Sequence, residues 1–238
     1  MEGRVQWGLL AILGVLSFFV IMGNWPVTTR FGVDGHWSSK RISVYEKAIN
    51  FLSRHLQTRR LAREVASGAT TDEEKLVNIF SWVSEHLQPT PDGFPVVDDH
   101  VWHIFVRGYG AGDQRTEAFA VLASYAGLPA TSVTLHVPDA QGALLLAAAQ
   151  SHGRTLVFDI PRHVLFRNQE GALASIEELQ RDPELVRQAT QGATIRGIPY
   201  ERFVAQLDKA TLRFSRMGNQ RPWFRFRSEL LRLLRTKS

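Results

Sequence analysis

A glycine-rich turn that runs directly into an amphipathic segment is the part of this sequence best suited to hold a reacting group. It reads RGYGAGDQRTEAFAVLASYAGLPA, residues 107–130, and places three glycines at alternate positions. The dinucleotide-binding pattern needs a glycine where Asp113 stands, and no Gly-Lys-Ser/Thr triplet follows for a phosphate loop. Two interpretations remain. The turn is either the seat of a nucleophile at the positive end of a helix dipole, or a tight entry in which the glycines adopt positive φ and Asp113 is the N-cap.

The same stretch resembles the core of the transglutaminase-like family. The resemblance rests on GYGAGDQRTEAFAVLASYAGLPATSVTL, followed by two strand-like runs and GRTLVFD, and extends over roughly residues 70–165. In that family a cysteine at the start of a helix, a histidine on the next strand and an aspartate at the end of a third strand form the catalytic triad. Carried over to this chain, the cysteine position is Gly112, the histidine position lies near Leu144, and the aspartate position is Asp159.

Two of these three positions lack the group that the chemistry needs. The mechanism requires a thiolate to attack the acyl carbon, an imidazole to move the proton, and a carboxylate to orient the imidazole. The chain contains no cysteine, and the resemblance leaves only the carboxylate of Asp159. Because the members of a triad act as a unit, this loss implies a catalytically inactive domain. Asp159 would then cap a turn or accept backbone hydrogen bonds.

The alternative is an active hydrolase or acyltransferase whose centre has been rebuilt without cysteine. Candidate groups stand near the degenerate positions or beside the strands. They are Thr116, Asp113 and Asp159, with His136, His152 or His163 as the base. An exposed or hydrogen-bonded structural role is more typical of such histidines, so the rebuilt centre is the less favoured interpretation.

A second group of polar residues lies in DDHVWH, which contains Asp98, Asp99, His100 and His103. On a helix the two histidines would share one face, as a zinc site requires. Two histidines beside acidic residues are also common in a polar surface turn, which is the interpretation we favour. We therefore expect no metal and no cofactor.

The amino-terminal segment is uncharged from Val5 to Thr29. Its core from Trp7 to Trp25 has 19 residues, which as a helix nearly match the hydrocarbon thickness of a bilayer. Tryptophans at both ends and the lack of a small-residue cleavage site predict an uncleaved, single-pass signal anchor at residues 1–29. The few basic residues around it weakly favour a body outside the cytoplasm, on the periplasmic side.

The positive charge of the chain is concentrated at its carboxyl end. Residues 213–238 carry eight basic residues and one acidic residue, a net of +7, which leaves 5 − 7 = −2 for the rest. Residues 215–238 are predicted to form a basic amphipathic helix from Pro222 onward. Its candidate binding residues are Arg221, Arg225, Arg232 and Arg235. The pattern predicts contact with membrane lipid or a membrane-protein partner. Packing on the protein's own domain is the alternative, and nucleic acid is disfavoured because no base-reading motif is present.

The remaining patterns predict helices first, a small antiparallel sheet next and helices last, which is typical of an α+β domain with a papain/transglutaminase-like core. Residues 30–69 are predicted as a polar connector and a long helix from about 42 to 66, and residues 70–214 as the transglutaminase-like domain. The elements expected in that domain are a helix with a Thr71–Glu74 capping box, a helix from near Asp113 to Gly127, strands at 130–137, 143–149 and 154–160, and helices at 175–191 and 200–214.

These expectations describe a membrane-anchored, catalytically inactive transglutaminase-like protein. The resemblance implies a binding or scaffolding subunit beside a cell-envelope assembly, such as one that handles exopolysaccharide. A peptide or glycan segment is the ligand expected in the vacant cleft between Gly112, Leu144 and Asp159. Asp113 and Gln114 are the candidate binding residues beside that cleft.

Overall fold

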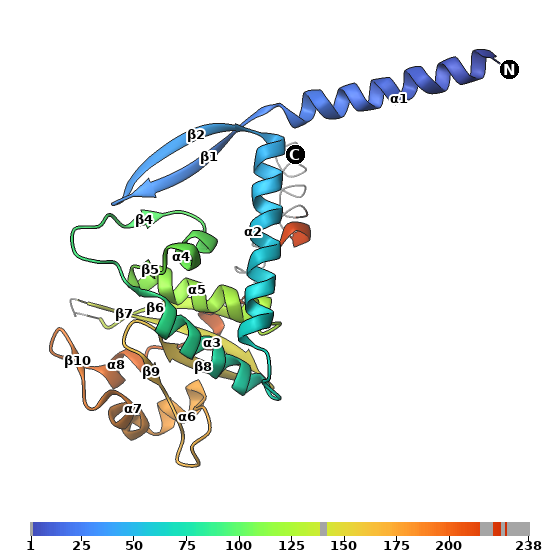
Figure 1. Cartoon of the computed structure of the whole chain (residues 1–238). Coiled ribbons are helices and arrows are strands. Elements are labelled where there is room, and N and C mark those ends of the chain that lie inside the picture. The colour runs from blue at the N-terminus through green and yellow to red at the C-terminus, as the bar shows by residue number, and fades with distance from the viewer. Residues whose placement is uncertain (1, 139–141, 215–220, 225–226, 228–238) are drawn as a thin grey trace. The chain divides into compact units, whose positions relative to one another are not determined.

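The computed structural model describes residues 2–138, 142–214, 221–224 and 227 of the 238-residue chain (Figure 1). The chain divides into two compact units. The first comprises residues 1–54 and 97–99, and the second comprises residues 55–96 and 100–238. All three triad positions that the resemblance indicates belong to the second unit.

A β-hairpin is the central feature of the first unit. It pairs β1 (Pro26–Val33) with β2 (His36–Ser43) over eight residues, and β4 (Val97–Asp98) pairs with the end of β1. The hairpin turns at Asp34 and Gly35, and both have the positive φ that a type I′ turn requires. The segment predicted as a polar connector thus contains a hairpin, with the Asp-Gly pair between its two strands.

Helices precede and follow the hairpin. α1 (Glu2–Gly23) comes before it, and α2 (Val44–Val65) comes after it and continues into the second unit. The long helix predicted near residues 42–66 is thereby confirmed. No helix made of residues that the structure describes is both long and apolar enough to cross a membrane. The anchor at residues 1–29 stays a prediction.

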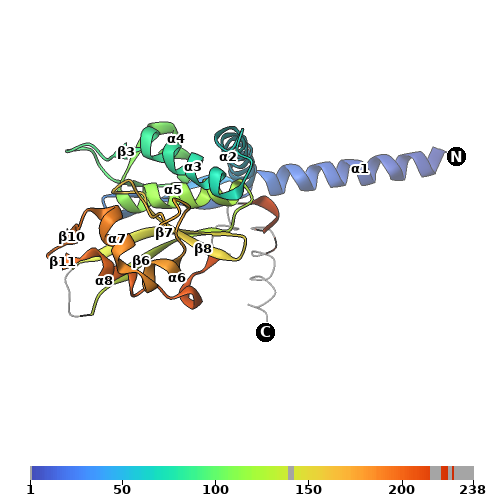
Figure 2. The same ribbon diagram turned by 90° about the horizontal axis from the view of Figure 1, so that it is seen from below.

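A four-stranded antiparallel sheet lies at the centre of the second unit (Figure 2). Its order is β6-β7-β8-β9, so every strand pairs with its neighbours in the sequence. The strands are β6 (Ala130–His136), β7 (Ala143–Ser151), β8 (Arg154–Asp159) and β9 (Val164–Leu165). The three predicted strands are confirmed, and the two residues of β9 are too few to give a strand pattern.

Side chains of β7 and β8 alternate between two hydrophobic clusters, one on each face of the sheet. Ala147 and Phe158 belong to the first cluster with residues of α3 and α5, whereas Leu144 and Val157 belong to the second with residues of α6, α7 and α8. These helices are α3 (Asp72–His86), α5 (Gly112–Tyr125), α6 (Ile176–Arg181), α7 (Pro183–Thr190) and α8 (Tyr200–Val204). Helices therefore cover both faces of the sheet (Figure 2).

The predicted helix boundaries hold at the start of this unit and fail at its end. The Thr71–Glu74 capping box is present at the start of α3. The helix predicted at 175–191 is divided into α6 and α7, because Pro183 cannot continue a helix and Asp182 caps the new one. The helix predicted at 200–214 ends at Val204. Short elements complete the unit: β3 (Gln88–Pro89), α4 (Val101–Arg107), β5 (Tyr109–Gly110), β10 (Thr194–Ile195), β11 (Ile198–Pro199) and the 3-10 helix η1 (Lys209–Thr211).

Candidate functional site

The glycine turn between α4 and α5 uses its glycines in different ways. Gly108 ends α4 in the left-handed region, at a φ of 74° that favours glycine. A Cβ added at Gly110 would stand 3.1–3.2 Å from atoms of Gln114 and Ile104, so glycine there permits close packing. The interpretation of the turn as a tight entry requires positive φ at the glycines, and of the three only Gly108 has it.

The helix that follows begins at Gly112, and its N-cap is Ala111 instead of the predicted Asp113. Alanine has no side chain that can cap a helix. The side chain of Gln114 replaces it, because its Oε1 accepts a hydrogen bond from the Ala111 N–H at 3.2 Å and another from Arg107 at 3.3 Å. Gln114 is buried, whereas Asp113 is exposed and accepts from the Gln114 N–H at 2.9 Å. Ligand binding by these two residues stays a prediction.

A ring from another segment lies close to Gly112, the position that the resemblance assigns to the cysteine of the family. A Cβ placed on Gly112 would lie 3.3 Å from Cγ of Pro161 and 3.6 Å from its Cβ. The shorter distance is tighter than nearly all real Cβ contacts, so a side chain at this position would have to displace the proline by a few tenths of an ångström. Pro161 belongs to the loop after β8, and its carbonyl accepts a long hydrogen bond of 3.4 Å from Arg115 of α5.

The histidine position of the family lies in an apolar core. Leu144 is fully buried and belongs to the second hydrophobic cluster, as do its strand neighbour Leu146 and Tyr200 of α8. An imidazole placed there would leave water for apolar surroundings and would lose hydrogen bonds. The three triad positions do not line a common vacant cleft, because Leu144 and Asp159 are fully buried and Leu144 packs in the cluster on the face of the sheet away from α5.

The aspartate position keeps its carboxylate, but the partners of that carboxylate are new. Asp159 is fully buried at the end of β8. It accepts hydrogen bonds from the Arg162 N–H at 3.0 Å, from Nη1 of the same arginine at 3.1 Å, and from the Tyr200 hydroxyl at 2.7 Å. The expected capped turn is confirmed by the bond to the Arg162 N–H. Within the described part of the chain, no histidine nitrogen bonds to this carboxylate.

Neighbouring positive charges stabilise the buried carboxylate of Asp159. Arg162 is partly exposed and forms an ion pair with Asp159. Arg115 of α5 is buried, and burial lowers the pKa of its guanidinium while the negative charge of Asp159 offsets part of that change. Burial also raises the pKa of the Tyr200 hydroxyl well above its usual value, and the charge of Asp159 raises it further. Tyr200 is therefore a neutral hydrogen-bond donor at any ordinary pH.

The groups considered for a rebuilt catalytic centre do not come together. Thr116 is fully buried, and its hydroxyl donates to the Gly112 carbonyl at 2.8 Å. The three candidate bases are exposed: His136 on β6, His152 in the turn between β7 and β8, and His163 in the loop after β8. Among the residues described, no hydrogen bond joins one of these histidines to Thr116, Asp113 or Asp159.

The segment DDHVWH forms the entry to α4. His100 is the N-cap of this helix, and its Nδ1 accepts a hydrogen bond from the Trp102 N–H at 3.0 Å. The described residues contain no group of three or more histidine or acidic side chains placed to hold a metal ion. The local role of His100 is therefore to cap a helix.

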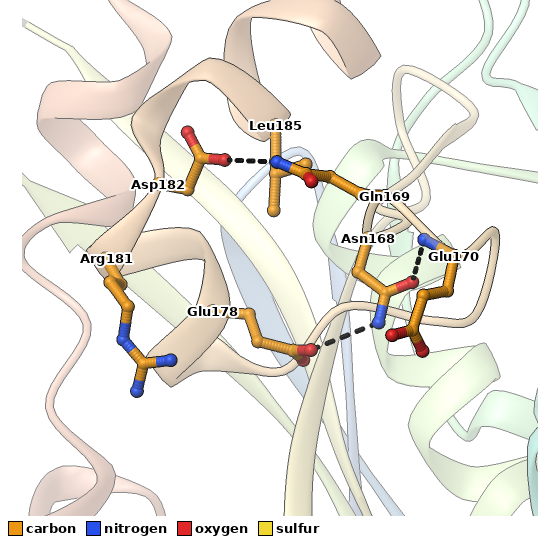
Figure 3. Close-up of a pocket in the computed structure, with 7 residues that line it drawn as sticks. All are labelled: Asn168, Gln169, Glu170, Glu178, Arg181, Asp182 and Leu185. Carbon is orange, nitrogen blue, oxygen red and sulfur yellow. Dashed lines mark hydrogen bonds between the residues drawn. The ribbon is translucent and has the colours of Figure 1, made fainter.

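Two cavities flank the loop from Arg167 to Leu173, and neither is lined by a triad position. One has a volume of about 370 Å³ and lies between this loop and the start of α3. The other, of about 230 Å³, lies between the loop and α6 (Figure 3). In the smaller cavity the carboxylate of Glu178 accepts a hydrogen bond from Asn168 at 3.1 Å. The Ser175 N–H and then Asn168 lower the pKa of Glu178 to about 2, so this carboxylate is already engaged within the fold.

Arg154, the first residue of β8, connects the helices on the two faces of the sheet. Its Nη1 donates to Glu73 of α3 at 2.7 Å, and its Nη2 donates to Glu178 of α6 at 3.0 Å. Nη2 also donates to the Leu173 carbonyl at 2.6 Å. A single guanidinium thus joins both layers at one end of this strand.

One of the four candidate arginines in the basic tail can be placed. Arg221 donates to the Ser124 carbonyl and stands 5.8 Å above the ring of Tyr125. The hydroxyl of the same tyrosine lies 2.9 Å from Nδ1 of His55 on α2. Arg221 therefore contacts its own domain. The other three candidates, Arg225, Arg232 and Arg235, lie outside the described residues.

Sequence reasoning missed the residues that now surround Asp159. Pro161 and Arg162 come two and three residues after Asp159, so the sequence near Asp159 already indicated a turn that its carboxylate could cap. Tyr200 lies 41 positions farther along the chain, and no motif marks it as the partner of Asp159. Only the fold of α8 against the sheet brings the two together.

Three solved structures are similar to part of this chain. A proposed protease from Parabacteroides distasonis is 13% identical, with a TM-score of 0.37 and coverage of 57% of this chain and 36% of that one. A proposed cysteine protease from Cytophaga hutchinsonii is 17% identical, with a TM-score of 0.40 and coverage of 53% and 45%. A structure described as a TGase is 11% identical, with a TM-score of 0.38 and coverage of 60% and 46%. This chain spans less than half the length of each, and TM-scores this low do not bear on its chemistry.

The family match is more specific than these structural similarities. No curated protein matches the chain. Residues 59–163 match the Transglutaminase-like superfamily, a range that runs from the end of α2 through α3, α5 and the first three strands of the sheet to the loop that holds Pro161. The matched range contains all three triad positions. Residues 59–163 therefore form a transglutaminase-like superfamily domain.

Proposed function

We propose that this protein is a membrane-anchored, non-catalytic transglutaminase-like module that binds or scaffolds a partner in a cell-envelope assembly. The observation that carries the proposal is the occupation of the triad positions. Pro161 stands against Gly112, Leu144 is buried in a core, and the carboxylate of Asp159 is held by Tyr200. Each position that would carry chemistry serves packing or internal hydrogen bonding.

The membrane part of the proposal rests on the amino-terminal sequence. The uncharged run from Val5 to Thr29 anchors the chain, and the body lies on the periplasmic side. Membrane lipid and a membrane protein are the partners, and exopolysaccharide machinery is one assembly that such a module would serve. A peptide or glycan ligand would have to bind outside the three triad positions, because Leu144 and Asp159 have no exposed surface.

A thiol placed at the family position tests the non-catalytic character. Gly112→Cys is expected to give no amine incorporation and no peptide hydrolysis above background, because Leu144 supplies no base. The natural chain has no cysteine, so a thiol reagent would report residue 112 alone and confirm that the variant carries an exposed, reactive sulfur. An active enzyme of the family serves as the positive control. Appreciable turnover by the single variant would refute the assignment of the missing histidine.

Purification of the tagged full chain from membranes in mild detergent tests the scaffolding role. We expect a second membrane protein to be recovered in a fixed ratio and to be lost when the detergent is made harsh. The matched control is the same tag on a chain that lacks residues 215–238, which should recover less partner if the basic tail contributes to binding. Recovery of the protein alone in mild detergent would contradict the proposal.

A further inference from the structure

One face of α2 exposes a line of large apolar side chains. Tyr45, Ile49, Leu52 and Leu56 follow each other at intervals of four, three and four residues, so they lie on one side of a continuous helix. Between 47% and 65% of each residue is exposed. We call these four residues the outward face of α2.

The outward face lies opposite the side by which α2 packs. Thr58 and Ala62 are the buried residues of this helix, and Leu61 packs against the first hydrophobic cluster. Because successive residues of a helix are rotated by about 100°, Thr58 and Ala62 point away from Leu52 and Leu56. The apolar side chains of the outward face therefore do not belong to the edge of the hydrophobic core. They form a second apolar surface that nothing in the described chain covers.

Basic side chains continue the outward face toward the end of the helix. Arg59, Arg60 and Arg63 are exposed, and α2 as a whole carries five basic and two acidic residues. An apolar line that passes into a group of guanidinium groups is the pattern of a helix that lies on anionic headgroups. A surface of this kind is complementary to an anionic bilayer. Parallel packing against a second copy would bring the arginines of the two helices together, whereas an anionic surface pairs with all of them.

Contacts within the first unit connect this surface to the end of α1. The Val44 N–H donates to the Trp25 carbonyl at 3.0 Å, and a Cβ placed on Gly23 would lie 3.8 Å from Cβ of Tyr45. Tyr45, the first residue of the outward face, thus stands beside the last turn of α1. Trp25 itself is exposed and has the amphipathic ring that is typical of a membrane interface.

We propose that the outward face of α2 lies on the surface of an anionic lipid bilayer, with its apolar side chains at the level of the headgroups and its arginines on lipid phosphates. This is a second membrane contact besides the predicted anchor, and it does not depend on whether the domain is catalytic. This contact would keep the residues of α2 that belong to the second unit at the membrane surface.

Single cysteines provide the test, because the natural chain has none. The full chain is labelled with the fluorophore NBD at Ile49→Cys or Leu52→Cys and reconstituted into vesicles of phosphatidylcholine with phosphatidylglycerol. The matched controls are Glu46→Cys and Asn50→Cys, which are exposed on a different side of the same helical turns. Spin labels on the lipid chains are expected to quench the first pair at least about twofold more than the second.

The charge part of the proposal has its own variant. Arg59→Gln/Arg60→Gln is expected to reduce quenching at position 49 to the level seen in vesicles of phosphatidylcholine alone, because each basic residue near an anionic surface contributes about fivefold to binding. Equal quenching at all four label positions would overturn the proposal, because it would leave the anchor as the one membrane contact detected. Protection of the label at position 49 without quenching by lipid would also overturn it, and would indicate a protein on this face.

Discussion

The helices on the two faces of the sheet have different origins and different effects on the site. α3 and α5 belong to the range that matches the transglutaminase-like superfamily, whereas α6, α7 and α8 lie beyond it. The matched range contains the three positions that the resemblance indicates, but Gly112 begins a helix on one face of the sheet and Leu144 packs in the cluster on the other. The segment beyond it supplies Tyr200, whose hydroxyl donates a hydrogen bond to the buried carboxylate of Asp159. The layer outside the matched range thus determines the hydrogen-bond partner of a carboxylate that belongs to the matched range.

β8 is the element through which the two layers are joined. Arg154 at its first position binds Glu73 of α3 and Glu178 of α6, and Asp159 at its last position binds Tyr200 of α8. A strand with apolar side chains on both faces thus carries a polar connection at each end. The two layers should therefore unfold together.

The largest expected effect comes from removing the carboxylate. Asp159→Ala leaves the Tyr200 hydroxyl and the buried guanidinium of Arg115 without their negative partner, so the free energy of unfolding should fall by about 3–5 kcal/mol. Urea unfolding of the full chain in mild detergent measures this change in the free energy of unfolding. Asp113→Ala is the matched control, because that carboxylate is exposed in the first turn of α5, and its loss should cost less than about 1 kcal/mol. Similar values for the two variants would mean that Asp159 does not join the layers.

A smaller loss is expected when only the connection to α8 is cut. Tyr200→Phe keeps the buried ring and removes the hydrogen bond to Asp159, which should lower the free energy of unfolding by about 1.5–3 kcal/mol. Tyr45→Phe, at an exposed position, should change it by less than about 0.5 kcal/mol. The effect of Tyr200→Phe should largely disappear in an Asp159→Ala background. Persistence of the full effect there would show that the hydroxyl acts through another partner.

The other end of β8 should show its contribution in the pH dependence of stability. The pKa of Glu178 is lowered from 4.5 to about 2, so its stabilisation is fully present above pH 4.5 and is lost as the pH falls toward 2. Since the side chain is partly exposed, the contribution is on the order of 1 kcal/mol. The stability difference between the natural chain and Glu178→Gln should therefore shrink over this range. Glu170→Gln, on the neighbouring loop, is the control, and an equal pH dependence for both would contradict the assignment.

The smallest effect concerns α5 alone. Ala111→Ser gives this helix the side-chain cap that alanine lacks, and it should raise the free energy of unfolding by about 0.5–1 kcal/mol. Thermal unfolding of the two chains side by side measures the change. A neutral result would mean that Gln114 already supplies all of the capping that this helix end can use.

The sequence predicts those parts of the molecule that local patterns control. The capping box of α3, the long helix α2 and three of the four strands of the main sheet follow from periodicity and residue type. The hairpin of β1 and β2 also has a local signal, because Asp34-Gly35 is a dipeptide typical of a two-residue hairpin turn. The division between α6 and α7 had one in Pro183.

Long-range pairings set the limit of such reasoning. The contact of Pro161 with Gly112 crosses 49 positions, and the hydrogen bond between Tyr200 and Asp159 crosses 41. Neither residue of such a pair indicates the contact by its type, because proline and tyrosine occur in many structural roles. Local patterns in the sequence therefore predict elements, and only the fold shows which distant residues contact Gly112 and Asp159.

Pro161 also bears on how this chain can change over time. Any side chain at Gly112 would place its Cβ 3.3 Å from Cγ of Pro161 and would require the proline ring to move by a few tenths of an ångström. A substitution at Pro161 alone would restore space but no chemistry. The space at position 112 therefore depends on the residue at position 161, so substitutions at the two positions should be coupled in their effect on packing.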